Sequence, residues 1–336
     1  MTESNLFEQQ TANKRKSAWL TLAFILFTGW VGFGGDLGFY LLTRDAPPES
    51  YHHVIPFVGL AFSVIAGGIA WSSWTNGSTQ VLRAAAAWEL IEPATPDQTR
   101  LVNVVEEMAI ASGLPKPKIW IIPDSDPNAF ATGKDPSNAH IAVTEGLLGM
   151  LDRDELQGVV AHEMAHVRNF DTRLMTLLAG MVGAIVLASD LMRNFLRFGG
   201  RVSGGGRRDK RDTNPIALLV LALWLITLLV APLVSRLMAM SVSRKREFLA
   251  DATGAQLTRN PMALASALEK IEARAEPTRS IAKGAAHMCI VDPSENHFAN
   301  RTGLLGRFAS HPPISQRLAR LRAMSFLPNQ PAAPSA

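Results

Sequence analysis

The sequence predicts a mainly α-helical, polytopic membrane protein with about four membrane helices and a small α+β domain in the cytoplasm. Three observations support this fold class. Hydrophobic residues make up 47% of the chain and charged residues only 18%, below the ~25% charged fraction that is usual in soluble domains. Four long apolar runs divide the chain. The segments between them have the residue spacing of soluble helices and strands.

The apolar runs are long enough, or nearly long enough, to cross a bilayer. They cover residues 18–42, 54–74, 174–189 and 215–235, and Asp36 is the only charged residue within them. About 20 apolar residues are needed to cross ~30 Å of hydrocarbon. The third run is shorter than this, so a buried or re-entrant helix is the alternative for it.

Charges beside the runs predict the orientation of the chain. Lys14, Arg15 and Lys16 place the N-terminus in the cytoplasm, and the acidic connection 44–53 then lies outside. The first run is long and lacks a cleavage site of small residues, so we expect an uncleaved anchor rather than a signal peptide. After the second run the chain returns to the cytoplasm.

An excess of cations opposes a simple crossing of the third and fourth runs. Residues 197–212 carry six cations and two anions, whereas connections outside the cytoplasm are usually poor in Lys and Arg. The cations are Arg197, Arg201, Arg207, Arg208, Lys210 and Arg211. Full crossing and re-entrance of these two runs therefore both stay open.

The runs and the segments between them divide the chain into five parts. These are 1–75 with the cytoplasmic N-terminus and two spans, 76–173 as a first cytoplasmic segment, 174–240 with two further membrane or re-entrant helices and a basic linker, 241–327 as a second cytoplasmic segment, and 328–336 as a disordered tail.

The first cytoplasmic segment has the pattern of an α+β domain. Apolar residues at helical spacing predict a helix at 98–112, which Gly113 ends. Residues 118–122 and 140–143 read as strands, and 126–133 as a turn followed by a short extended piece. From residue 244 onward the pattern returns to amphipathic helices.

The next helix carries the sequence HEMAH at 162–166. Asp152 and Glu155 form a capping box that predicts its start. His162 and His166 lie one turn apart on one face, where both rings can bind a zinc ion, and Glu163 can reach the water that a catalytic zinc keeps. The alternative is an ordinary helix with a polar stripe. Because the rest of the helix is apolar, such a stripe would be buried at a high cost, which favours zinc.

The third ligand must come from elsewhere in the chain. No histidine lies between His166 and His287. Four acidic residues lie between His166 and the fourth run. The first is too close to His166 on the same helix to reach around the metal, the second lies next to an apolar run, and the last two lie in the glycine–arginine loop. The four are Asp171, Asp190, Asp209 and Asp212.

Glu247 is the next candidate. It lies on a new helix with Asp251 one turn later, where Asp251 can accept the second N–H of a ligating imidazole. His166 and Glu247 can meet only if an even number of crossings separates them. The third and fourth runs supply two crossings, or none if both are re-entrant.

Several motifs in combination resemble one family, the HtpX-type membrane zinc metalloproteases, which are relatives of the CAAX prenyl proteases. The motifs are HEMAH at 162–166 with Asn169 and Asp171, NAFATG at 128–133, SRKREFLAD at 243–251 and SHPPISQRLARL at 310–321. The order of runs and motifs is similar along most of the chain.

The resemblance implies a zincin-like cytoplasmic domain and an endopeptidase of the cell inner membrane that acts in quality control of misfolded membrane proteins. It implies one Zn²⁺ per chain bound by His162, His166 and Glu247, with Glu163 as the catalytic residue. The expected partners are polypeptide substrates, especially membrane proteins, and the lipid bilayer.

Two further assignments concern the substrate. His311 could donate to the oxyanion, or it could be a structural histidine ahead of a helix. Asn128, Ala129 and Phe130 could form an edge strand that pairs with an extended peptide, or they could be an ordinary hairpin strand.

Other classes of protein fit the sequence less well. A scaffold or chaperone with a structural zinc would not need Glu163. A transporter would need polar groups at mid-membrane, but Asp36 and Asp190 can equally mark the ends of spans. Nucleic acid is not an expected partner despite a net charge of +4, because the basic residues form no single patch. Cys289 is the only cysteine, which excludes an intrachain disulfide.

Overall fold

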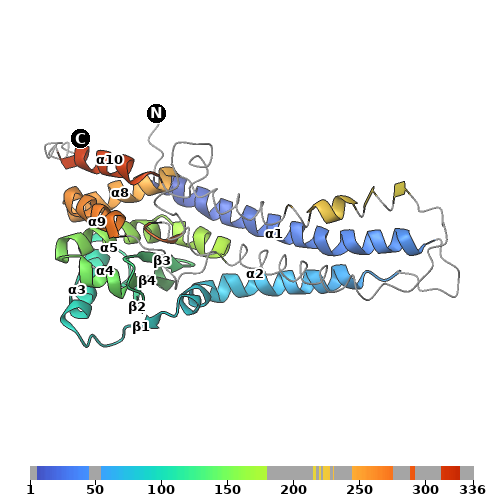
Figure 1. Ribbon diagram of the computed structural model, residues 1–336, viewed down its shortest axis with the longest axis horizontal. Coiled ribbons are helices and arrows are strands. Elements are labelled where there is room, and N and C mark those ends of the chain that lie inside the picture. The colour runs from blue at the N-terminus through green and yellow to red at the C-terminus, as the bar shows by residue number, and fades with distance from the viewer. Residues whose placement is uncertain are drawn as a thin grey trace. The chain divides into compact units, whose positions relative to one another are not determined.

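The structure is a computed structural model and is mostly helical with one small sheet (Figure 1). It describes residues 6–44, 54–179, 215–216, 219–220, 222–227, 230, 244–274, 288–291 and 312–325.

The chain forms two compact units. The sheet unit combines Met1–Arg15, Asn76–Thr176 and Met240–Ala336, and the helical unit combines Lys16–Thr75 with Leu177–Ala239. The helical unit thus contains the long apolar segments of the sequence. The sheet unit is built from three segments that lie far apart in the sequence.

The sheet has four strands in the order β1-β2-β4-β3. They are β1 (Trp88–Glu89), β2 (Lys118–Ile122), β3 (Ala129–Gly133) and β4 (Ala139–Thr144). β2 and β4 are parallel, whereas β1 pairs with β2 and β3 pairs with β4 in antiparallel fashion. The strands predicted at 118–122 and 140–143 are confirmed, and the extended piece after residue 126 is β3.

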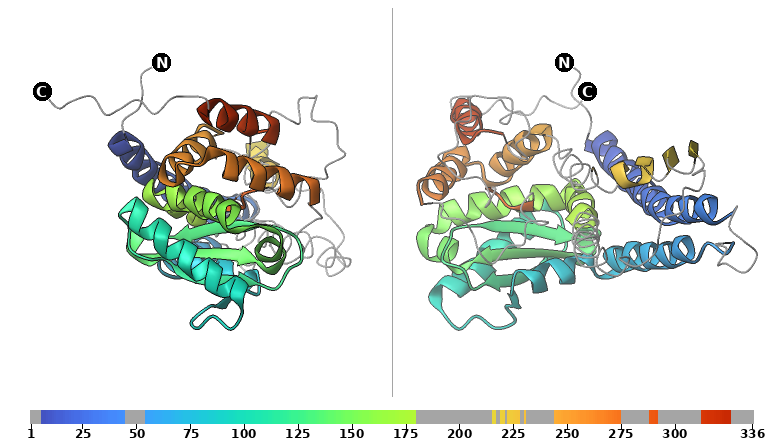
Figure 2. Two further views of the ribbon diagram at one scale, coloured as in Figure 1. Left: turned by 90° about the vertical axis from the view of Figure 1, so that its left-hand side faces the viewer. Right: turned by 45° about the vertical axis from the view of Figure 1, so that its right-hand side comes forward.

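Helices cover the sheet in successive layers. They are α3 (Pro96–Ser112), α4 (Glu145–Met150), α5 (Arg153–Arg168), α8 (Arg244–Thr258), α9 (Pro261–Arg274) and α10 (Ile314–Ser325), with a 3-10 turn at Pro136–Asn138. Both views in Figure 2 show α5 above the sheet, α8 and α9 above α5, and α10 at the top. The HEMAH helix α5 therefore lies at the centre of the unit.

Local sequence and close packing fix the position of α5. Asp152 accepts the N–H of Glu155 while the Glu155 side chain accepts the N–H of Asp152, so the predicted capping box is confirmed. A Cβ atom at Gly254 would lie 3.1 Å from the backbone nitrogen of His162. Glycine at this position thus allows α8 to approach α5 directly beside the first histidine.

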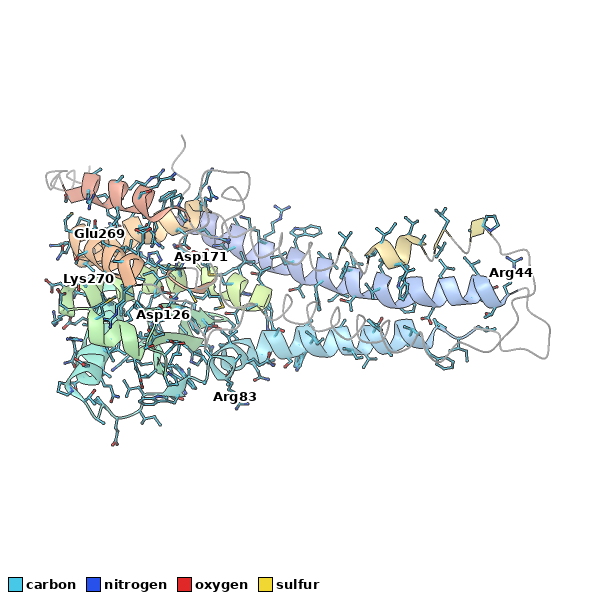
Figure 3. The ribbon with its side chains drawn as sticks, viewed as in Figure 1. Arg44, Arg83, Asp126, Asp171, Glu269 and Lys270 are labelled. Carbon is cyan, nitrogen blue, oxygen red and sulfur yellow. The ribbon has the colours of Figure 1, made fainter. Side chains whose placement is uncertain are left out.

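The helical unit contains the apolar parts of α1 (Leu6–Thr43) and α2 (Phe57–Ala84). Thr11–Gly38 and Phe57–Ala84 are long and apolar enough to cross a membrane, and no other helix among the described residues meets this test. Large apolar side chains such as Leu26 and Trp71 are 64% and 72% exposed, as expected of helices that face lipid. Arg44 follows the end of α1 (Figure 3).

Asp36 does not mark the end of a span. It lies inside α1, only 3% exposed, and its carboxylate accepts the backbone N–H groups of Val58 and Gly59 in the first turn of α2. The first N–H groups of a helix have no partner within the helix. A carboxylate that accepts them explains why an apolar helix retains a charged residue.

The third and fourth runs are described in part. Residues 174–179 are helical, as are 215–216, 219–220, 222–227 and 230. Within the helical unit, Trp224 donates its indole N–H to the carbonyl of Val31 at 2.6 Å, so the fourth run contacts α1. The remainder of both runs, the connection with Asp190, Asp209 and Asp212, and the tail 328–336 lie outside the described residues.

Candidate metal centre

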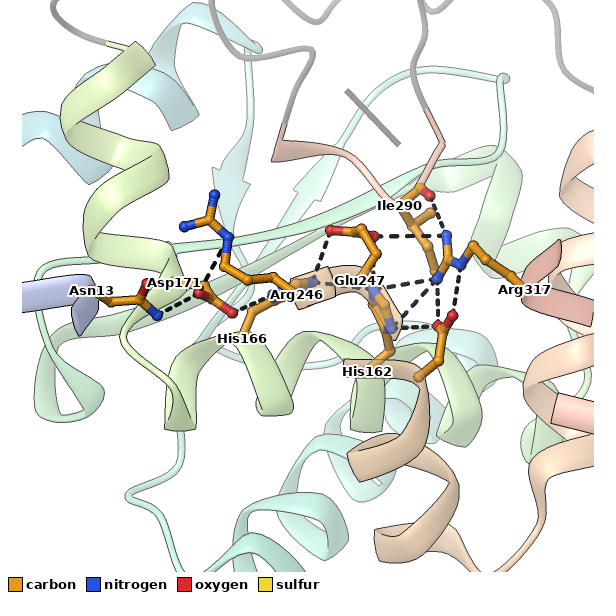
Figure 4. A network of polar contacts seen from close by, with 9 residues as sticks. Asn13, His162, His166, Asp171, Arg246, Glu247, Ile290 and Arg317 are labelled. Atoms are coloured by element: carbon orange, nitrogen blue, oxygen red, sulfur yellow. Dashed lines mark hydrogen bonds and ion pairs between the residues drawn. The ribbon is translucent and has the colours of Figure 1, made fainter. Parts of the chain in front are cut away.

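Two histidines of α5 and one glutamate of α8 converge inside the sheet unit (Figure 4). The donor atoms of His162, His166 and Glu247 lie within 4.8 Å of one another. The side chains of His162 and Glu247 are 1% exposed, and that of His166 is 6% exposed. Glu247 follows His166 by about 80 positions in the sequence, and the structure brings it to the same point as the two histidines.

The distances between the donor atoms suit a metal ion. His162 Nε2 lies 3.2 Å from His166 Nε2 and 3.7 Å from Glu247 Oε2, and His166 Nε2 lies 3.5 Å from Glu247 Oε1. Ligands bound at ~2.0–2.1 Å in tetrahedral geometry are about 3.3 Å apart. The spacing of the three residues therefore fits the ligands of a single divalent ion.

A carboxylate orients each imidazole. Asp251 Oδ1 lies 3.0 Å from Nδ1 of His162, and Asp171 Oδ2 lies 3.1 Å from Nδ1 of His166. With Nδ1 engaged, each ring directs Nε2 toward the common point. Asp251 thus lies within hydrogen-bond distance of the first histidine. Asp171 is rejected as a metal ligand on the basis of the sequence. In the structure it contacts the second histidine, His166, instead.

The contacts of the imidazoles with the two carboxylates shift the pKa values of His166 and Asp251. Burial lowers the pKa of His166, but the hydrogen bond to Asp171 and the nearby charge of Glu247 raise it to about 9 in the metal-free protein. Burial raises the pKa of Asp251, but Arg317 and His162 lower it to about 2. A carboxylate hydrogen-bonded to the far nitrogen of an imidazole makes that ring a better metal ligand.

Arg317 of α10 is a site residue that sequence reasoning missed. Its buried guanidinium donates twice to Asp251, from Nε at 2.9 Å and from Nη2 at 2.6 Å, and Nη1 lies 3.8 Å from Glu247. Nη1 also donates to the carbonyl of Ile290 at 3.0 Å. A signal was present, because Arg317 occupies the apolar face of its helix between the buried residues Ile314, Leu318 and Leu321.

Glu163 is close enough to His162, His166 and Glu247 to interact with them electrostatically, and it is 2% exposed. Burial raises the pKa of its carboxyl group above the usual range, while His162, His166 and a hydrogen bond from the backbone N–H of Ala131 act in the opposite direction. A raised pKa brings the group closer to neutral pH, where it can both accept and release a proton. The contact with Ala131 also fixes the carboxylate against β3.

The predicted substrate strand at residues 128–130 has little exposure to a substrate. Asn128, Ala129 and Phe130 are buried, and Ile290 donates its backbone N–H to the carbonyl of Ala129 at 2.9 Å. The chain itself therefore pairs with this end of β3, and substrate pairing at 128–130 stays a prediction. His311 lies outside the described residues.

A buried His-Glu-x-x-His helix that receives a third donor from a distant helix is the arrangement that metal-dependent peptide hydrolysis requires. The fold and the site thus place the chain in the class of metalloproteases. The chain belongs to peptidase family M48, whose model matches residues 96–325.

Relatives with the name "Protease HtpX homolog" match most of the chain, which confirms the resemblance noted in the sequence. The relative from Caldanaerobacter subterraneus subsp. tengcongensis is 38% identical over 327 residues, which cover 97% of this chain and 100% of the relative. The relative from Thermoanaerobacter pseudethanolicus is 45% identical over 235 residues, which cover 70% of this chain and 75% of the relative. The crystal structure of S. mikatae Ste24p matches with a TM-score of 0.45 at 19% identity, over 90% of this chain and 66% of that chain.

Proposed function

We propose that the protein is a zinc-dependent endopeptidase of the cell inner membrane that hydrolyses misfolded or damaged membrane proteins, with its active site in the cytoplasm. One observation carries this proposal. His162, His166 and Glu247 surround one buried point, and Glu163 stands beside it. The two apolar helices, whose large side chains are exposed, support action at a membrane.

The roles of the residues follow from their contacts. His162, His166 and Glu247 would hold one Zn²⁺, which supplies Lewis acidity to a peptide carbonyl and to water. Glu163 takes the proton of the attacking water and passes it to the leaving amine, a step for which a buried carboxylate with a raised pKa is suited. Arg317 is engaged by Asp251 and Ile290, so it orients the site rather than reaching a substrate. His311 is the proposed donor to the oxyanion.

Glu163→Gln tests the chemical step. The variant should bind as much zinc as the wild type, because Glu163 is not one of the converging donors. Casein cleavage should fall by ~10²–10⁴-fold, the usual contribution of a general acid/base. Metal analysis and a cleavage assay on the same purified samples measure both quantities.

The matched control is Glu92→Gln, which removes the same charge at an exposed position and should cleave casein normally. Undiminished cleavage by Glu163→Gln would contradict the proposed chemistry. It would favour a scaffold or chaperone in which zinc is structural.

The proposed orientation is tested with cysteines at two exposed positions, Ser137 of the sheet unit and Arg44 after α1. A maleimide that cannot cross the membrane should label Arg44→Cys in intact cells. It should label Ser137→Cys only after the cells are opened. Cys289 is 1% exposed and should not react in the folded protein. Labelling of Ser137→Cys in intact cells would place the active site outside and refute the orientation.

A further inference from the structure

The first residues of α1 belong to the sheet unit rather than to the helical unit. The helix begins at Leu6, well before the first apolar run, and Met1–Arg15 are grouped with the residues of the metal centre. Asn13, on this polar stretch, is only 5% exposed. A buried amide needs hydrogen-bond partners, and those of Asn13 lie beside the second histidine.

Asn13 contacts the carboxylate that orients His166. Its side-chain Nδ2 donates to Oδ1 of Asp171 at 2.7 Å and to the backbone carbonyl of Asn169 at 2.9 Å. The other oxygen of Asp171, Oδ2, lies 3.1 Å from Nδ1 of His166. Figure 4 shows Asn13, Asp171 and His166 in a continuous chain of polar contacts that leads to the metal donors.

A nearby cation, Arg246, does not replace the amide of Asn13 as a hydrogen-bond donor to Asp171. Arg246 Nε lies 3.7 Å from the same Oδ1 atom, beyond hydrogen-bond distance. Asp171 itself is fully buried. Within the described part of the chain, Asn13 is therefore the side chain that donates a hydrogen bond to Oδ1 and fixes the plane of this carboxylate.

The next residue of α1 supports the same turn. Lys14 Nζ lies 4.3 Å from the ring centroid of Phe170, a cation–π contact. Phe170 has a φ of 58°, a left-handed conformation that is unfavourable for a bulky residue. Two adjacent residues of α1 thus contact the turn that follows the HEMAH helix, one at its carboxylate and one at its strained residue.

We propose that Asn13 is a positioning residue of the metal centre. The segment ahead of the first membrane helix orients Asp171, Asp171 orients the ring of His166, and zinc retention depends on this chain of contacts. The inference rests on the proposed zinc site. The two can fail separately. Zinc binding by the wild type tests the site itself, and the zinc affinity of the Asn13 variants tests the positioning role.

Asn13→Leu removes both hydrogen bonds at similar size. Zinc affinity of the full-length protein in detergent, measured by competition with a chelator, should fall on the order of tenfold, at the low end of the ~10–100-fold effect of outer contacts to metal ligands. Asn13→Asp retains the size but sets a carboxylate against Asp171, and its zinc affinity should fall further. Asn103→Leu is the matched control, because Asn103 is exposed on α3.

A double-mutant cycle separates positioning from general support of the fold. If Asn13 acts through Asp171, Asn13→Leu should cost little zinc affinity in an Asp171→Asn background, since residues that act through each other are not additive. Wild-type zinc affinity in both Asn13 variants would overturn the inference, as would full additivity with Asp171→Asn. A wild-type protein that binds no zinc would refute the proposed function together with it.

Discussion

Glu247→Ala should lose most of its zinc and, with it, proteolysis. Glu247 is the donor that α8 contributes to the site, and its oxygens lie 3.5 and 3.7 Å from the two imidazole nitrogens. Two imidazoles alone leave a zinc ion under-coordinated, because a catalytic site keeps three protein ligands. Metal analysis of the purified variant, after dialysis against a weak chelator, measures the loss.

Two further variants define what the loss means. Glu145→Ala removes an exposed glutamate and should retain zinc. From sequence, Asp171→Ala would be expected to retain zinc as well. Since Asp171 contacts Nδ1 of His166, it should instead weaken zinc binding by ~10–100-fold, as Asp251→Ala should. If Asp171→Ala lost zinc completely while Glu247→Ala kept it, the third ligand would be Asp171 and our site would be wrong.

Arg317→Met should destabilise the sheet unit by ~3–5 kcal/mol, the usual effect of removing one partner of a buried ion pair. Arg317 and Asp251 are each 1% exposed. Without the guanidinium, the carboxylate of Asp251 stays buried beside Glu247 with less compensation. Thermal unfolding of the zinc-free protein in detergent measures the effect apart from metal binding. Arg322→Met, at a half-exposed position of the same helix, is the control and should unfold like the wild type.

The dependence of this effect on pH has a definite sign. The pKa of Asp251 is about 2 in the folded protein, below its ordinary value of 3.8. The stabilisation from this pair is therefore complete above pH 4 and is lost as the pH falls through 3.8 toward 2. Wild type and Arg317→Met should differ by a constant amount at neutral pH and converge only in acid. Equal stability at pH 7 would contradict the assigned role of Arg317.

Much of the site could be predicted because its parts are local in sequence. The spacing of His162 and His166 defines one face of a helix, and the Asp152–Glu155 capping box defines where that helix begins. Glu247 could be reached by elimination. Each of these inferences uses a separation of a few residues or a short list of alternatives.

The remaining contacts depend on segments that meet only in the folded chain. Asn13 and Asp171 are 158 positions apart, and Arg317 and Asp251 are 66 apart. Helical spacing shows that Arg317 lies on an apolar face of its helix, but it does not show that Asp251 is the carboxylate that pairs with it. Asp36 is a similar case. Its charge within an apolar run is evident, whereas its partners belong to another helix.

The contact of Asp36 with α2 has a consequence for how this protein can vary. Two N–H groups in the first turn of α2, those of Val58 and Gly59, find their acceptor in α1, whereas the N–H of Phe57 donates to the carbonyl of Ile55 just before the helix. A Cβ atom at Gly32 would lie 2.8 Å from the Cα atom of Gly59, so the two backbones are in close contact beside this carboxylate. The alignment of α1 with α2 is thereby encoded in the helices themselves. We therefore expect the helix pair to keep its alignment when residues between the two helices are inserted or removed.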